Sequence, residues 1–129
     1  MASTPAYAAT PRVDIAAISS ANTNRDGTGS ITTLATAVAA GTKWTSITVQ
    51  ATATTTAGMV RIYISTNSGS TWRLHDEFPI TAVTPSASAP AFRLKRSYDD
   101  LALYGTTQSI GVTTHNAESF HVTALGADF

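Results

Sequence analysis

Hydrophobic and polar residues alternate along much of this chain with the two-residue period of β-strands. The alternation is clearest in residues 58–80, where Val60, Ile62 and Ile64 are interleaved with Arg61 and Tyr63. After a polar segment over residues 66–70 it resumes, and one face of the second run then carries Trp72, Leu74, Phe78 and Ile80. Two such runs joined by a short polar segment with a glycine predict a β-hairpin.

The opposite face of this hairpin is predicted to point outward and carries Arg61, Tyr63, Arg73, His75, Glu77 and Pro79. Asp76 breaks the pattern, because its position places it on the apolar side of its strand. A bulge, a strand end or a nearby arginine partner would explain an acid there, since buried acids are usually paired.

Further short strands follow at intervals of about ten residues. They are predicted over residues 13–19, 31–40, 43–54, 91–96, 101–104, 108–114 and 118–125. Val13, Ile15 and Ala17 share one face of the first, and Phe92 and Leu94 point inward. The 31–40 segment also has apolar residues at helical spacing, but its threonines favour a strand. Asp26-Gly27 marks a turn within residues 22–29.

Eight or nine short strands with regular turn signals predict an all-β fold, an antiparallel two-sheet β-sandwich of jelly-roll-like type. The Pro- and Ser-rich loop over residues 83–90 is expected to cross between the sheets. Residues 1–11 contain two prolines and no periodicity, so they predict an extended N-terminal arm before a single domain over residues 12–129.

Charge and composition narrow the function classes. The 129 residues carry no formal net charge and only 12% are charged, which argues against nucleic acid or a membrane surface as partner. Low repulsion between copies favours self-association.

Cysteine is absent, so disulfides and thiolate metal sites are excluded. The first residues lack a basic and an apolar signal region, so synthesis in the cytoplasm without export is expected.

Candidate catalytic residues are sparse. The three histidines, His75, His115 and His121, lack the spacing of metal ligands, so no metal or cofactor is predicted. A hydrolase would need Asp76, His75 and Glu118 to converge, and no second acid is placed beside Asp76 by the sequence. We therefore expect the protein not to be an enzyme.

The turn over residues 65–72, Ser-Thr-Asn-Ser-Gly-Ser-Thr-Trp, resembles the Asp-box hairpin of sialidases and other β-propellers, with Asn67 in place of its aspartate. A single copy in a chain too short for a propeller indicates a structural turn. In it Asn67 is expected to bond the turn backbone, and Gly69 to permit a positive φ.

Several segments resemble a group of small virion structural proteins of tailed bacteriophages and prophages. They are residues 4–13, 20–29, 55–61 and 114–120, and the likeness extends to the closing residues 126–129. The resemblance implies a structural protein of the particle, made in the host cytoplasm. A capsid decoration or cement protein fits a β-sandwich with an arm. It would lie on the capsid surface, bind the major capsid protein and join neighbouring subunits.

For such a protein we expect contacts through the arm, at Pro5, Tyr7, Pro11 and Arg12, with a terminus that docks on nothing as the alternative. We also expect a homo-oligomer, with a homotrimer favoured, because closed symmetry would let small sandwiches pool apolar area. A second hypothesis is a carbohydrate-binding or adhesive domain of a tail or fibre, in which Tyr63, Tyr98 or Tyr104 stacks on sugars.

Overall fold

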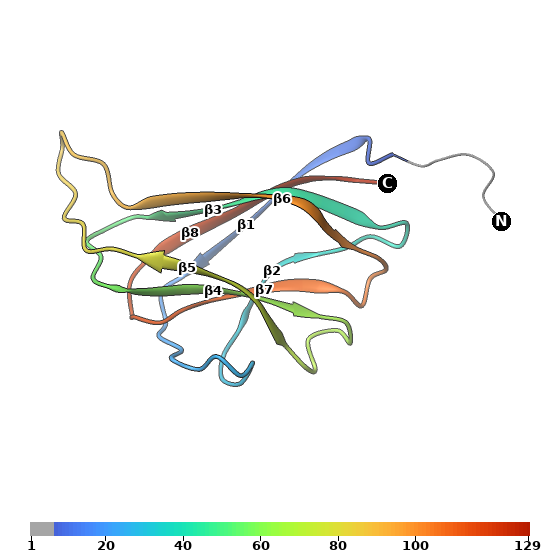
Figure 1. The fold of residues 1–129 in the computed structure, drawn as a ribbon, viewed down its shortest axis with the longest axis horizontal. Coiled ribbons are helices and arrows are strands. Elements are labelled where there is room, and N and C mark those ends of the chain that lie inside the picture. Colours follow the sequence, from blue (N-terminus) through green and yellow to red (C-terminus); the bar gives the residue numbers. More distant parts are fainter. Residues whose placement is uncertain (1–6) are drawn as a thin grey trace.

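Two β-sheets pack face to face in the computed structural model, which describes residues 7–129 (Figure 1). The described residues contain eight strands and no helix, so the predicted all-β sandwich is confirmed and residues 31–40 contain a strand. The strands are β1 (Thr10–Ile18), β2 (Thr32–Thr36), β3 (Thr42–Ala51), β4 (Gly58–Ser65), β5 (Arg73–Ile80), β6 (Arg93–Leu103), β7 (Ser109–Thr114) and β8 (Phe120–Asp128).

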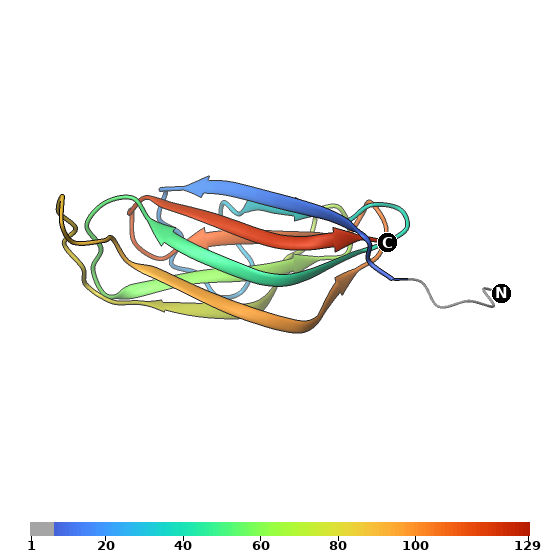
Figure 2. The same ribbon diagram turned by 90° about the horizontal axis from the view of Figure 1, so that it is seen from above.

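Each sheet has four strands, and every neighbouring pair is antiparallel. Sheet A has the order β1-β8-β3-β6, and sheet B has the order β2-β7-β4-β5. The pairs β1–β8, β2–β7, β3–β6 and β4–β5 are therefore nested in sequence, and β4–β5 is the hairpin that the sequence predicts. The loop over residues 83–90 connects β5 in sheet B to β6 in sheet A, as predicted. Figure 2 shows the strands of the two layers running along the same long axis.

The core lies between the two sheets and is built from inward-facing residues of both. Trp44, Ile47 and Phe120 of sheet A and Phe78 and Ile110 of sheet B are fully buried in it. Phe92 and Leu94 pack against its margin, as the sequence predicts.

The predicted strands over residues 91–96 and 101–104 form one strand, β6. Trp44 pairs with Leu101 but Ser46 pairs with Ser97, so residues 98–100 lie opposite Thr45 alone. This irregularity separates two regular stretches of β6, which the sequence presents as two strands.

Strand pairing begins earlier at the N-terminus than the sequence predicts. The arm was expected to end at residue 11, but Thr10 and Pro11 already belong to β1 and pair with Asp128 and Ala127 of β8. The Ala9 N–H also donates to the Asp128 carbonyl oxygen at 3.0 Å. The end of the predicted arm is thus the first part of a strand, while Pro5 lies outside the described residues.

The hairpin turn over residues 65–72 has the structural role that the sequence predicts. The Thr71 N–H donates to Asn67 Oδ1 at 2.9 Å, and the Gly69 N–H donates to Ser65 Oγ at 2.8 Å. Gly69 has a φ of +83°, a left-handed conformation that glycine adopts without a steric penalty.

A bulge in β5 changes which of its side chains point to the core and which point outward. Asp76 pairs with Ile62 and Leu74 pairs with Tyr63, so His75 is an extra residue on β5. Phe78 and Ile80 face the core as predicted. Leu74, which was predicted to join them, lies instead on the outer side beside Tyr63, since one added residue exchanges the two faces of a strand.

The outward face of the hairpin is partly buried by another segment of the chain. Tyr63 has no exposed surface, and its hydroxyl donates to the Asn24 carbonyl oxygen at 2.8 Å. Arg61 is 2% exposed and donates to the Asn22 carbonyl oxygen. The connection between β1 and β2 therefore covers this side of sheet B, although the sequence alone predicted an open outward face.

This covering layer is tightly packed above β7. A Cβ added at Gly111 would lie 2.6 Å from Ile31 Cγ2 and 2.8 Å from the Trp72 ring. Glycine is thus required here because two side chains rest directly on the strand backbone. Trp72, predicted on the inner face, belongs to this outer layer.

Substitution of Gly111→Ala should lower the free energy of unfolding by about 2 kcal/mol, because Ile31 and Trp72 must move outward to make room. Chemical denaturation followed by tryptophan fluorescence measures this, with Ala102→Gly on exposed β6 as a control for a glycine–alanine exchange. A Gly111→Ala variant as stable as the parent would contradict the packing described here.

Candidate functional site

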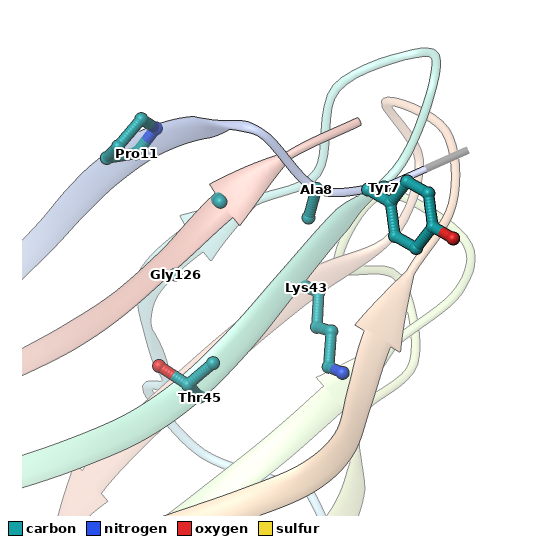
Figure 3. Close-up of a pocket in the computed structure, with 7 residues that line it drawn as sticks. Tyr7, Ala8, Pro11, Lys43, Thr45 and Gly126 are labelled. Atoms are coloured by element: carbon teal, nitrogen blue, oxygen red, sulfur yellow. The ribbon is translucent and has the colours of Figure 1, made fainter. Parts of the chain in front are cut away.

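A shallow groove of about 370 Å³ lies on the outer face of sheet A, near the start of β1 (Figure 3). Three strands and the residues before β1 contribute to it. It is lined by Tyr7, Ala8, Pro11, Lys43, Thr45, Gly126 and Ala127. The groove thus combines an aromatic ring, apolar surface and one cation.

Its floor is formed by the close approach of β3 and β8. A Cβ at Gly126 would lie 2.2 Å from the Lys43 carbonyl oxygen, so the backbones come closer here than an alanine would allow. The register of β3 also shifts between Trp44 and Ser46, where Thr45 is left on the outer side. Gly126 and this bulge together hollow the surface.

An apolar stripe continues from the groove along β1 and β8. Val13 is 60% exposed and Ile15 is 65% exposed, and Leu125, which pairs with Val13, is 40% exposed. The face shared by Val13, Ile15 and Ala17 is therefore the outer face of sheet A. We call Val13, Ile15, Ala17 and Leu125 the apolar stripe.

The structure separates the four residues predicted to make partner contacts. Tyr7 is 78% exposed at the rim of the groove, and Pro11 lines it. Arg12 points away from the groove and pairs with carboxylates of the fold. Pro5 lies outside the described residues. The structure thus brings Tyr7 and Pro11 together and gives Arg12 a different setting.

Arg12 holds the two ends of the described chain together. Its guanidinium pairs with Asp14 at 2.8 Å and with Asp128, on β8, at 3.0 Å. The Trp44 Nε1–H donates to Asp14 Oδ2 at 3.0 Å, and Arg12 lies over the Trp44 ring at 5.5 Å. We call Arg12, Asp14, Trp44, Thr42 and Asp128 the β1 network.

The charges of the β1 network stabilise one another. The hydrogen bond from the Thr42 hydroxyl, and then the Arg12 guanidinium, hold the pKa of Asp128 below its usual value. Hydrogen bonding to Asp14, and secondarily to Asp128, raises the pKa of Arg12 against the opposing effect of burial. The ionised forms are therefore the ones that the folded state favours.

Asp76 has the arginine partner that the sequence analysis considered. Arg96 Nη1 donates to Asp76 Oδ1, and the Tyr98 hydroxyl donates to Asp76 Oδ2 at 2.7 Å. Both partners lie on β6, so the carboxylate joins the edges of the two sheets. Burial, and then the hydrogen bond to Asp76, raise the pKa of Tyr98.

A second charged cluster lies under the β1–β2 connection. Glu77 pairs with Arg25 at 2.8 Å and with Arg61 at 3.0 Å, and the Arg25 hydrogen bond is the main reason that the pKa of Glu77 is lowered. Arg61 Nη2 lies 3.2 Å from His115 Nδ1. These contacts tie the connection to β4 and β5.

The hydrolase candidates are engaged in separate structural contacts. Asp76 is held by β6, whereas Glu118 Oε2 accepts the Thr56 N–H at 2.7 Å. Within residues 7–129, no three His, Asp or Glu side chains converge in an arrangement that could hold a metal ion. His75 and His121 are exposed, as their positions in the strands predict.

The apolar stripe, Lys43 and Gly126 were not predicted from the sequence as parts of an interaction surface. Arg12 and Asp14 alternate with Val13 and Ile15, so the pattern itself marks two faces of β1. Apolar residues of a strand are normally assigned to the core. In β1 they lie on the outer face instead, and the sequence pattern alone does not show this.

Comparison with known proteins adds no relative: no family model, no curated protein and no solved structure matches the chain. The part of the chain that the structure describes contains no helix long and apolar enough to span a membrane.

Substitution of Tyr98→Phe should lower the free energy of unfolding by about 1–2 kcal/mol, because the Asp76 carboxylate loses a donor in a partly buried site. Urea denaturation measures the change. Tyr104→Phe is the matched control, since Tyr104 is 70% exposed. Equal losses in the two variants would contradict a structural role for the Asp76–Tyr98 bond.

Acidification should weaken the fold through Asp128. Its folded-state pKa lies below the ordinary value of 3.8, so its stabilising contribution is complete above that value and is lost as the pH falls through the folded-state pKa. An Asp128→Asn variant should be less stable at neutral pH and should lose less stability on acidification. Denaturant midpoints measured across the acid range test this, and parallel pH profiles in parent and variant would rule it out.

Proposed function

We propose that this chain is a non-enzymatic structural protein of a tailed-phage particle, a capsid decoration or cement protein. It binds the outer shell through the major capsid protein, joins neighbouring capsid subunits and requires no cofactor. This proposal rests on the resemblance of its sequence segments and on the surface of sheet A.

The observation that carries the proposal is the groove with the apolar stripe beside it. Large exposed apolar side chains that lie together on one face of a small protein favour an interaction site. Tyr7 supplies a rigid anchor of the kind enriched at the centres of interfaces, and Lys43 supplies a charge that can select the partner. The same surface contains Pro11, one of the contact residues predicted from the sequence.

The carbohydrate-binding alternative receives less support from the tyrosines that suggested it. Tyr63 has no exposed surface, and the Tyr98 hydroxyl is bonded to Asp76. Tyr104 is the one of these three that remains open, and a single exposed ring offers little selectivity for a sugar.

The nested strand pairs support a finer description of the fold. An order that pairs β1 with β8, β2 with β7, β3 with β6 and β4 with β5 is the order expected when one long antiparallel ribbon is rolled into two sheets. We therefore propose a jelly-roll type of sandwich. This type is common among capsid proteins and lectins, so it is compatible with both functions.

The double substitution Tyr7→Ala and Lys43→Glu should weaken attachment to shells about tenfold, the effect of about 1.4 kcal/mol of lost binding free energy. Shells assembled from the major capsid protein of the encoding phage or prophage are incubated with purified protein, and bound protein is quantified after sedimentation.

The matched control is Lys95→Glu, which makes the same charge change on exposed β6 of the same sheet. Full occupancy by the double variant would overturn the assignment of the groove. Absence of binding by the parent protein would overturn the proposed function itself.

A further inference from the structure

We propose that β1 pairs in antiparallel orientation with β1 of a second copy of this chain, so that the two A sheets become one continuous sheet. The inference goes beyond the proposed function, because it concerns how two copies meet in the absence of any shell. It rests on the edge of sheet A and on the residues that β1 presents there.

Apart from Pro11 near its start, the outer edge of β1 lacks the features that normally prevent strands from pairing. Edge strands are usually protected by outward charges, bulges, prolines or short length. β1 is nine residues long and pairs with β8 in an unbroken register. Its two charged residues, Arg12 and Asp14, are held by the β1 network, which leaves apolar side chains outside.

The other three sheet edges carry such protection. β2 has five residues and a register shift between Thr33 and Ala35. β5 has the bulge at His75 and a proline at Pro79. β6 presents exposed charges and departs from regular pairing over residues 98–100. Among the four edges, β1 is therefore the one suited to strand addition.

The hydrogen-bond pattern identifies the free backbone groups. The Thr52 N–H donates to the Ser119 carbonyl oxygen, directly beyond the Ala51–Phe120 pair of β3 and β8. Since bonding direction alternates along an antiparallel strand, odd-numbered residues of β8 face β3 and even-numbered residues face β1.

The even-numbered residues of β1 are the partners of the even-numbered residues of β8. The N–H and C=O groups of Val13, Ile15 and Ala17 consequently point to the free edge. At Pro11 the edge has an acceptor but no donor, which favours an end to pairing there.

A two-fold axis at Ile15 satisfies these groups without opposing like charges. Ile15 then pairs with Ile15 of the second copy, and Val13 pairs with Ala17. Each of these pairs exchanges two hydrogen bonds. In this register Asp14 lies opposite Ala16 of the second copy. A two-fold axis at residue 14 would instead place the two Asp14 carboxylates opposite each other.

The same register makes the outer surface continuous. Residues on one face of a strand meet residues on the same face of its antiparallel neighbour when odd positions pair with odd positions. The apolar stripes of the two copies therefore adjoin across the axis, and the exposed surface of Val13 and Ile15 is reduced. A foreign strand would need to match both the bonding pattern and this stripe, whereas a second β1 matches them by symmetry.

Light scattering of the purified full-length chain, coupled to size exclusion, tests the assembly. We expect a mass of twice the 13.4 kDa of one chain, and a shift to a single chain in Ile15→Lys. Leu74→Lys is the matched control and should remain paired, since Leu74 is an exposed apolar residue on the edge of the other sheet. Thermal unfolding of both variants tests whether the fold is retained.

A monomeric parent protein, the trimer favoured by the sequence analysis, or a dimer that survives Ile15→Lys would overturn this inference. Because no shell is present in the measurement, these outcomes leave the test of the proposed function separate.

Cysteine cross-linking tests the register directly, because the chain has no cysteine of its own. Ile15→Cys places two thiols at a directly opposed pair, about 5.5 Å apart between Cα atoms, and should give a disulfide-linked dimer on mild oxidation. Val13→Cys places them four residues apart along the strand, about 13 Å, and should not cross-link.

Adding Ala17→Cys to Val13→Cys should restore the linked dimer, because these two positions oppose each other. The three variants are compared on non-reducing gels at the same protein concentration. Equal cross-linking of Ile15→Cys and Val13→Cys would overturn the proposed register.

Discussion

The inward attachment of Arg12 and Asp14 is the constraint on which much of this surface depends. Arg12 binds carboxylates on β1 and β8, and the Trp44 indole donates to one of them from β3. The network thus links three neighbouring strands of sheet A and fixes which face of β1 turns inward. With the charges of β1 committed to the network, the residues between them form an uncharged outer surface.

A second layer stabilises the other sheet. The core between the sheets draws on a sequence rich in small residues, and the connection between β1 and β2 adds a further packed layer over β4 and β7. Arg61 and Tyr63 are covered on the outer side of sheet B, where they donate hydrogen bonds to the backbone carbonyls of Asn22 and Asn24. The two sides of the sandwich are consequently unequal: sheet B is covered by its own chain, whereas sheet A presents an apolar stripe and a groove.

This asymmetry relates the two proposals to each other. Pairing at Ile15 keeps the outer faces of both A sheets on one side of the joined sheet, so the two grooves would lie on the same side, one near each end of the paired strands. A protein with two identical sites can hold two neighbouring subunits, and the second contact forms at a high effective concentration. Pairing through one edge strand would therefore supply the bivalence that the proposed cement role needs.

Much of the local structure followed from the sequence. The period-2 runs and the turn chemistry around Asn67 and Gly69 predicted the hairpin and a structural role for the turn, because both depend on residues close in sequence. The number and regular spacing of short strands predicted the sandwich as a class. For Asp76 the sequence left a bulge, a strand end and a nearby arginine open as explanations. The identity of the arginine as Arg96 depends on where β5 and β6 meet. Of the candidate site, the sequence supplied Tyr7 and Pro11 but neither Lys43 nor Gly126.

The sequence by itself determined which residues share a face within each regular stretch of strand, because side-chain direction alternates there. Only the tertiary structure decided which face is inside. One extra residue, His75, moved Leu74 to the outer side. The connection between β1 and β2 covers Tyr63. Asp128 on β8 pairs with Arg12 on the inner side of β1, so Val13 and Ile15 point outward. Each decision depended on contacts between segments far apart in the chain, and hydrophobic periodicity carries no information about such contacts.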